Sequence, residues 1–315
     1  MCHAACVAHE DTLNLKKEVT GMIINQAAMA GIYKTFSTIF NQALAEGKAP
    51  MWPLVAMETP SGGHSVDYKW LGDFPGMREW VGDRVIKDLS GFHYELANKS
   101  FESTVEVDRD DIDDDQIGVY IPMIQGLAQA AKEHPDILVW ALLAAGFTSL
   151  CFDGQYFFDD DHPVGDGSGS NYGGGSGTPW YLMDLSRPIK PIILQMRKRP
   201  QFVAQDRPDD EQAFMRKKFR YGADDRKNVG YGLWQLAYGS KRTLDTTYYP
   251  AARTAMSSLT KEDGVTPLGI TATHLIVGSS NESAGKALVE AQFTAAGASN
   301  IWYNSTKLVV VPWLP

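Results

Sequence analysis

The sequence is poor in cysteine and has no long apolar run. Its three cysteines among 315 residues follow no regular spacing, so they predict no disulfide framework and suit a reducing cytoplasm. The longest apolar run covers residues 137–147, which is shorter than the roughly 18 residues that a membrane-spanning helix needs. Charged residues at positions 11 and 16–18 interrupt any signal-peptide pattern. These absences exclude a disulfide-stapled secreted domain and predict no membrane partner.

An excess of positive charge is also missing. The formal net charge is −9, whereas proteins that bind nucleic acid non-specifically usually carry a basic patch. One basic cluster is formed by residues 197–199 and 216–218, and acidic residues at 206 and 209–211 lie near it in the sequence. We interpret this cluster as a solvated or subunit-facing surface.

The remaining composition is that of an ordinary globular protein. Hydrophobic residues make up 44% of the chain and charged residues 21%. The length allows one large domain or two smaller ones, with enough apolar residues for a sizeable core.

Sequence motifs for catalysis and phosphate binding are absent. Residues 165–177 contain seven glycines, but they lack the G-x-G-x-x-G spacing and a following Lys-Ser/Thr pair, so they predict a flexible surface loop and not a phosphate cradle. Cys151 has no motif around it, and no nucleophile elbow is present. We expect no cofactor.

The acidic segment that ends in His162 is the best candidate for a metal site. Asp159, Asp160 and Asp161 precede this histidine, and carboxylates together with imidazole could bind a divalent cation. Adjacent residues of an extended segment point in opposite directions, however, so the three aspartates cannot all face one ion. Asp153 and Asp166 could complete a site only if the loop folds back. We therefore interpret residues 159–166 as a solvated acidic turn, with a metal-dependent enzyme as the alternative.

Two long segments in the first half of the chain have a clear periodicity. Residues 22–46 have apolar positions at helical spacing, and Gly47 suits the end of that helix. Residues 92–108 alternate as a strand does, with a change of phase around Asn98 that predicts a bulge or turn. Two strands alone are marginally stable in water. Such a ribbon would need something outside itself to pack on.

A strongly acidic segment precedes the next predicted helix. Residues 108–115 contain six aspartates, and negative charge suits the first turn of a helix. Pro122 fits that first turn, so we expect a helix from there to about Glu133. Pro135 then predicts the start of a second helix, which ends near Gly146.

The second half of the chain alternates between strand and helix patterns. Residues 191–194 and 218–236 are rich in strand formers, residues 253–259 and 283–291 favour helices, and the final KLVVVPW run at 307–313 is typical of a buried strand. Pattern alone predicts an α+β protein with an exposed ribbon.

Residues 68–115 are dense in Trp, Arg and Asp but carry no catalytic signature, which suggests contacts and not turnover. Within an expected short helix at 77–89, Trp80 and Arg84 lie one turn apart and can stack. On a solvated surface the ion pairs of such a helix are worth under roughly 1 kcal/mol each. At a desolvated subunit contact, Trp and Arg are typical anchors.

The order of residues in this stretch resembles the major head protein of Mu-like phages and prophages, the protein T family. The matching patterns are W-L-G-x-x-P-x-M-R-E-W-x-G-D-R at 70–84, N-K-x-F-E at 98–102 and D-x-D-D at 111–114. The resemblance covers residues 22–313 and is also specific at 147–164, 180–200 and 219–240.

The resemblance implies a Hong Kong 97-type α+β capsid fold. It implies an N-terminal arm at 22–60 and an extended loop or β-ribbon at 61–108. Residues 109–315 would form two interleaved domains, a peripheral domain that contains a long spine helix and an axial domain. It also implies a structural function and not an enzymatic one: a major capsid protein that assembles into the icosahedral head around double-stranded DNA. The implied inter-subunit contacts are Trp70, Met77, Arg78, Trp80 and Arg84.

The implied partners are further copies of the chain in pentamers and hexamers. A scaffold or maturation protease, a portal and decoration proteins are also expected, and packaged DNA would be held without sequence-specific binding. The protein would assemble in the cytoplasm of a bacterial host and reside in the virion. Nothing in the sequence predicts covalent cross-linking. An encapsulin-type compartment shell is the alternative with the same fold.

The first 21 residues stand apart from this resemblance. Lys17, Glu18 and Val19 can be encoded by a purine-rich ribosome-binding sequence, and Met22 follows at the usual spacing. Residues 1–21 are therefore either an untranslated leader read in frame or a genuine extension. The intact mass of the subunit distinguishes these two interpretations.

Overall fold

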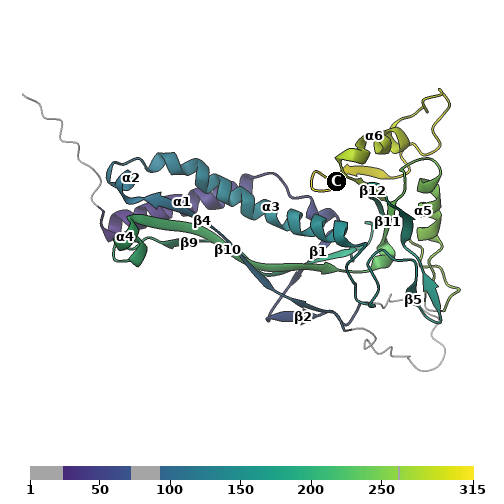
Figure 1. The fold of residues 1–315 in the computed structure, drawn as a ribbon, viewed down its shortest axis with the longest axis horizontal. Helices are drawn as coiled ribbons and strands as arrows, with labels where there is room; N and C mark the ends of the chain where they lie inside the picture. The colour runs from purple at the N-terminus through teal and green to yellow at the C-terminus, as the bar shows by residue number, and fades with distance from the viewer. Residues whose placement is uncertain (1–23, 72–92, 262) are drawn as a thin grey trace, which may run out of the picture.

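The computed structural model describes residues 24–71, 93–261 and 263–315. The molecule is elongated (Figure 1), with two helices along a long sheet in one half and a second sheet in a more compact half. We call these parts the long half and the compact half.

The long half is built on a four-stranded sheet in the order β1-β9-β10-β4. The strands are β1 (Ala56–Pro60), β9 (Ile192–Gln205), β10 (Lys218–Tyr231) and β4 (Lys99–Asp108). β1 runs parallel to β9, and β10 is antiparallel to both of its neighbours. Helices α1 (Gln26–Glu46) and α3 (Ile121–Ala145) lie along this sheet in Figure 1.

The predicted first helix is confirmed as α1. Asn25 caps it by accepting a hydrogen bond from the backbone N–H of Ala28 at 2.9 Å, and Gly47 ends it. Its buried residues recur at helical spacing and pack with apolar residues of α3, β9 and β10 into one core. That core includes Met29, Ile32, Phe36, Phe40, Ile124, Leu127, Phe202, Phe219 and Tyr221.

Helix α3 corrects two predictions. Pro122 does lie in the first turn, but Pro135 sits inside one continuous helix of 25 residues and does not begin a second one. An interior proline removes a backbone hydrogen bond. The buried residues before and after Pro135 nevertheless lie on one face of the helix, and this face packs against the rest of the chain. Asp136 adds an anchor, because its carboxylate accepts hydrogen bonds from the backbone N–H groups of Met51 and Trp52. Tertiary packing therefore outweighs the local proline penalty.

The six aspartates open a different helix from the expected one. Asp108 caps α2 (Arg109–Asp113) by accepting a hydrogen bond from the N–H of Asp110 at 3.0 Å. A 3₁₀ turn, Ile117–Tyr120, separates α2 from α3. The acidic segment thus ends the strand β4 and begins a short helix, whereas α3 begins without it.

The predicted change of phase at Asn98 is confirmed. This residue separates β3 (Glu95–Ala97) from β4, and its buried side-chain amide donates to Ser61 Oγ at 2.8 Å. β3 pairs with β2 (Ser65–Asp67), whereas β4 pairs with β10 along its whole length. The predicted need for a packing partner outside the ribbon is met for β4 by strand β10 of the same chain. The expected helix at 77–89 lies outside the described residues.

The compact half contains a five-stranded sheet in the order β13-β12-β8-β11-β7. Its strands are β7 (Tyr172–Gly175), β8 (Trp180–Met183), β11 (Ala237–Lys241), β12 (His274–Val277) and β13 (Lys307–Val310). Around it lie α5 (Tyr248–Ser257), α6 (Glu282–Gly285), a π-helical turn (Lys286–Glu290) and the hairpin β5 (His162–Val164) with β6 (Gly167–Gly169). Every residue of the central strand β8 is buried.

The remaining elements are short. The 3₁₀ turns are Trp52–Leu54, Trp234–Leu236 and Ser279–Asn281, and α4 (Glu211–Arg216) connects β9 to β10 at the tip of the long half (Figure 1). The predicted strands at 191–194, 218–236 and 307–313 and the helices at 253–259 and 283–291 all overlap observed elements. None of the described helices is long and apolar enough to cross a membrane.

The glycine-rich segment is not the flexible loop that the sequence predicts, because it forms β6 and β7. A Cβ atom at Gly169 would lie 2.9 Å from the ring of Trp234, and one at Gly173 would lie 2.7 Å from Ser240 Oγ. The glycines therefore allow close packing of backbone on side chains.

Candidate functional site

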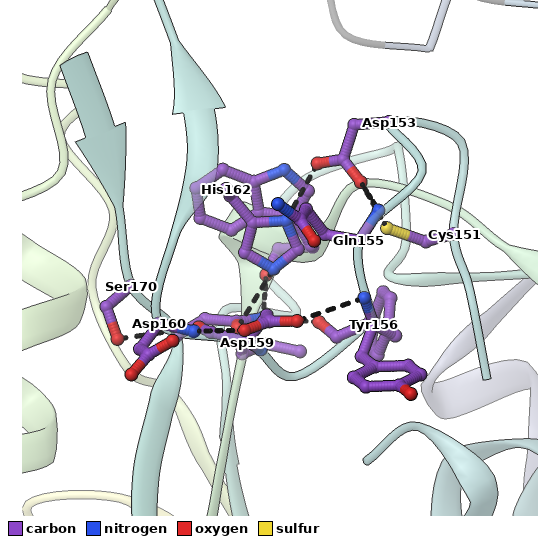
Figure 2. A network of polar contacts seen from close by, with 12 residues as sticks. Cys151, Asp153, Gln155, Tyr156, Asp159, Asp160, His162 and Ser170 are labelled. Atoms are coloured by element: carbon purple, nitrogen blue, oxygen red, sulfur yellow. Dashed lines mark hydrogen bonds and ion pairs between the residues drawn. The ribbon is translucent and has the colours of Figure 1, made fainter. Parts of the chain in front are cut away.

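His162 is the centre of a buried polar network in the compact half (Figure 2). Its Nδ1 lies 2.7 Å from Asp153 Oδ2, and the two side chains are 0% and 1% exposed. The imidazole also stacks on Trp234, with ring centroids 3.9 Å apart and planes 8° from parallel. The loop at 151–162 has folded back, as a site at this place requires, and it brings Asp153 to the histidine.

Hydrogen-bond partners on both sides hold the His162 ring in place. The amide nitrogen of Asn171 donates to the carbonyl oxygens of Phe157 and Ala237, so its Oδ1, which is 3.2 Å from His162 Nε2, must accept a proton from that nitrogen. Burial opposes the charge on Asp153, but hydrogen bonds from His162 and Cys151 outweigh it and hold the pKa of this carboxyl below its usual value. His162 thus links Asp153 and Asn171 through two buried hydrogen bonds.

This network does not offer a vacant set of metal ligands. Ligand atoms of Cys151, Asp153 and His162 lie within 4.8 Å of one another, yet both nitrogens of His162 are engaged in hydrogen bonds. Burial raises the pKa of the Cys151 thiol far above its usual value, and the thiol donates to Asp153 Oδ1 at 3.0 Å. A thiolate ligand is therefore disfavoured.

The neighbouring aspartates also act structurally. Asp159 accepts hydrogen bonds from the backbone N–H groups of Tyr156 at 3.2 Å and Asp160 at 2.8 Å. Asp160 and Asp161 are exposed, and one carboxyl oxygen of each of the three aspartates lies within 4.8 Å of the others. The expectation that the three cannot face one ion is therefore wrong, because the segment turns here and is not extended. Exposed acidic turns of this kind are common without a metal.

Only one of the five expected contact residues can be placed. Trp70 is half-buried, packs against the main core of its own chain and meets Tyr68 edge-on, with ring centroids 6.2 Å apart. Met77, Arg78, Trp80 and Arg84 lie outside the described residues, so their contacts stay a prediction.

Two exposed apolar surfaces were missed by the sequence reasoning. On α4, Phe214 is 82% exposed and Met215 70%; in the loop after the π-helical turn, Phe293 is 62% exposed and Ile301 82%. The sequence did hold a signal for the second surface, because residues 291–306 carry no charge. Large exposed apolar side chains of this kind mark interaction sites.

Four of the six cations of the basic cluster form ion pairs within the chain, although not with the acidic residues nearest in sequence. Lys198 pairs with Asp224, Arg199 with Glu58, and both Lys218 and Arg220 with Glu106. Hydrogen bonds from Arg220 and Lys218 hold the pKa of Glu106 below its usual value. The cluster is thus a paired surface on the sheet, which fits the predicted solvated or subunit-facing role.

Comparison with known proteins identifies the family. The sequence model of the family described as Mu-like prophage major head subunit gpT matches residues 29–314. The chain belongs to this family. It is a major capsid protein that forms the head shell, as the resemblance implied, and the encapsulin-type alternative is set aside.

Relatives in two bacterial systems agree with the gpT family assignment. The major capsid protein of Escherichia phage Mu is 37% identical over 307 residues, covering 93% of this chain and 100% of that protein. The Mu-like prophage FluMu major head subunit of Haemophilus influenzae is 40% identical over 277 residues, covering 84% of this chain and 89% of that protein.

Solved structures confirm the α+β capsid fold of the gpT family. The procapsid of bacteriophage JBD30 superposes with a TM-score of 0.82 and 41% identity, over 92% of this chain and 100% of that one. The JBD30 capsid decorated with minor capsid protein trimers superposes with a TM-score of 0.74 and 32% identity, over 87% of this chain and 93% of that one. The predicted Hong Kong 97-type fold is therefore confirmed.

Proposed function

We propose that the shell forms through apolar side chains at both ends of the elongated subunit, together with the segment between β2 and β3. The observation that carries this proposal is the exposure of Phe214 and Met215 at the tip of the long half and of Phe293 and Ile301 in the compact half. A single copy leaves these side chains in water. Copies packed side by side would bury them, and a stable contact typically buries roughly 1,200 Å² or more in total.

The expected contact residues of the gpT resemblance belong to this proposal. Met77, Arg78, Trp80 and Arg84 lie between β2 and β3, and Trp70 precedes them with part of its ring accessible. Desolvated Trp and Arg side chains dominate the energetics of protein contacts. We assign residues 22–60 to an arm, 61–108 to the extended loop and 109–315 to the peripheral and axial domains, with β4 contributing to the long sheet as well.

The proposed partners follow from the head shell. Copies of the chain would form pentamers and hexamers, and packaged double-stranded DNA would fill the shell without being read in sequence. Decoration by a minor capsid protein is supported by the decorated JBD30 capsid. A scaffold or protease and a portal complete the set, and assembly would take place in the host cytoplasm before the protein becomes part of the virion.

We also propose that the protein is not an enzyme. In the buried cluster around His162, the imidazole nitrogens, the carboxylate and the thiol are all engaged in hydrogen bonds. These contacts support a structural role. Purified protein should therefore keep its unfolding temperature in a metal chelator, whereas a substantial loss would favour the metal-dependent alternative.

Electron microscopy of particles tests the contact assignment. Trp80→Ala or Arg84→Ala should leave the subunit soluble and folded by circular dichroism but prevent closed shells. Asp160→Asn, a change at an exposed position of the compact half, is the control and should assemble normally. Closed shells from both Trp80→Ala and Arg84→Ala would show that this segment is an ordinary surface.

A further inference from the structure

A polar cleft in the compact half lies between the end of β7 and the end of β11. It has a volume of about 450 Å³, and its lining includes Gly175, Ser176, Thr178, Lys241 and Arg242. Thr243, Tyr248 and Asn281 complete its wall. The cleft is separate from the His162 network and from the exposed apolar surfaces described above.

The two cations of this cleft lack carboxylate partners. Among the described residues, neither Lys241 nor Arg242 forms an ion pair, whereas the basic cluster on the long sheet is paired throughout much of its length. The neighbouring acids are engaged elsewhere: Glu282 pairs with Lys286 at 2.5 Å, and Asp245 accepts the N–H of Thr247 at 2.8 Å.

Aromatic rings hold both cationic side chains in place. Lys241 Nζ lies 4.3 Å from the ring centroid of Phe147, and Arg242 Cζ lies 4.9 Å from that of Tyr248. Cation–π contacts of this kind restrict the side chain while leaving its N–H groups available to a ligand.

Several backbone carbonyl oxygens around the cleft are paired with donors of the same chain. The carbonyl oxygen of Lys241 accepts from Gly177 N–H at 2.8 Å, and that of Arg242 accepts from the indole of Trp180 at 2.7 Å. Asn281 donates to the carbonyl of Thr178 at 3.2 Å. These oxygens would repel an anion, and internal donors already occupy them.

Three hydroxyl groups add further donors. Within the described part of the chain, the side chains of Ser176, Thr178 and Thr243 have no hydrogen-bond partner, and all three line the cleft. Two cations with several hydroxyls match a ligand that has more acceptor oxygens than a carboxylate.

Glycine is required for this geometry. Gly174 and Gly175 have φ of +71° and +94°, values that L side chains rarely adopt. A Cβ atom at Gly175 would lie 2.5 Å from the backbone nitrogen of Arg242, and one at Gly174 would lie 3.4 Å from its guanidinium. Glycines therefore bring the loop backbone directly against the cationic pair. No helix follows this loop, so the cleft differs from a P-loop and escapes a search for that motif.

We propose that this cleft binds a phosphate group through Arg242, Lys241 and the hydroxyls of Ser176, Thr178 and Thr243. The phosphate belongs either to a free phosphate compound or to the backbone of a nucleic acid. The proposal goes beyond the shell contacts and does not depend on them, because the cleft is complete within one subunit.

Calorimetric titration of the unassembled subunit with inorganic phosphate tests the site. The double variant Lys241→Gln with Arg242→Gln should weaken phosphate binding by at least about tenfold, since each charge-assisted hydrogen bond contributes strongly. The matched control, Lys34→Gln with Lys48→Gln, removes the same charge from exposed positions outside the cleft. It should bind phosphate as the unaltered protein does.

Unchanged binding in the cleft variant, equal weakening in both variants, or an absence of phosphate binding would overturn the proposal. Acetate bound as tightly as phosphate would overturn the assignment to phosphate. Arg242→Ala alone, at an exposed side chain, provides a milder variant if the double change disturbs folding, and it should still weaken binding measurably.

A duplex oligonucleotide distinguishes the two sources of the phosphate group. If the ligand is a nucleic-acid backbone, the duplex should compete with phosphate. In the cleft variant, the slope of log binding constant against log salt concentration for the duplex should then become shallower by about 2. If the ligand is a free phosphate compound, the duplex should not compete, while the loss of phosphate binding in the cleft variant remains.

Discussion

The two halves of this capsid subunit bury their apolar residues in different ways. In the compact half, the central strand β8 is entirely buried and the core includes Trp180 and Leu275 together with aromatic residues of several connections. In the long half, α1 and α3 line one side of the sheet, and the edge strand β4 exposes most of its residues. The compact half therefore has the more complete core, whereas the long half leaves surface for other copies to cover.

The largest expected effect concerns the buried contact between His162 and Asp153 in the compact half. His162→Ala removes one partner and leaves Asp153 charged in a buried site, so the free energy of unfolding should fall by about 3–5 kcal/mol. Chemical denaturation of the unassembled subunit measures this change. Asp160→Asn, at an exposed neighbour, should change it by under about 0.5 kcal/mol. A loss below 1 kcal/mol for His162→Ala would show that the pair is not a stabilising link.

A matched pair of core substitutions tests the dependence of the long half on neighbours. Phe36→Ala in the long half and Leu275→Ala in the compact half should each cost about 2–5 kcal/mol in the free subunit. Hydrogen exchange should show that assembly restores protection of β4 and α1 in Phe36→Ala, because neighbouring copies cover the long half. Protection of β8 and β12 in Leu275→Ala should change less. Equal recovery in both variants would remove the distinction between the halves.

Acid should loosen the compact half through Asp153. The folded-state pKa of this carboxyl is lowered, chiefly by the hydrogen bond from His162 acting against burial. Its contribution is therefore present above the unfolded pKa of about 3.9 and is lost as the pH falls through the folded value. Denaturation midpoints measured from pH 5 downward should decline, and the decline should be shallower in His162→Ala. Parallel curves would exclude the hydrogen bond between His162 and Asp153 as the source of the decline.

The smallest expected effect on stability belongs to the tip of the long half. Phe214→Ser with Met215→Ser changes exposed side chains, so the free energy of unfolding should shift by less than about 0.5 kcal/mol. Shell formation, followed by light scattering, should nevertheless slow or stop. Val265→Ser, at a side chain that is 80% exposed, is the control. Normal assembly of the α4 variant would exclude this tip from the contacts.

Periodicity was a good guide wherever local sequence decides the structure. The helix from residue 26 and the break at Asn98 follow from apolar spacing and a change of phase. Pro135 misled the prediction because packing on two cores, and the anchor from Asp136, are invisible in a local pattern. The glycine-rich segment misled it for the same reason: Gly169 and Gly173 serve close approach to Trp234 and Ser240, which lie more than 60 positions away.

The candidate sites were harder to predict than the fold. The sequence singled out His162, but its partnership with Asp153 and Asn171 depends on a loop that folds back. The cleft at Lys241 and Arg242 joins two segments that carry no shared motif. The family resemblance supplied the function, because contact surfaces between copies leave only a weak signature in one chain.

The unbroken helix α3 has a mechanical consequence. Ile124 and Leu127 near its start belong to the core of the long half, whereas Trp140 and Leu143 near its end belong to that of the compact half. Its 25 residues span roughly 37 Å at about 1.5 Å per residue. The helix is thus a rigid element anchored in both cores, so a rotation of one end of the helix also moves the other end. Adjustment of subunits to different curvatures of a closed surface would then be taken up by the twist of β9 and β10, whose pairing already shifts register beside Arg226.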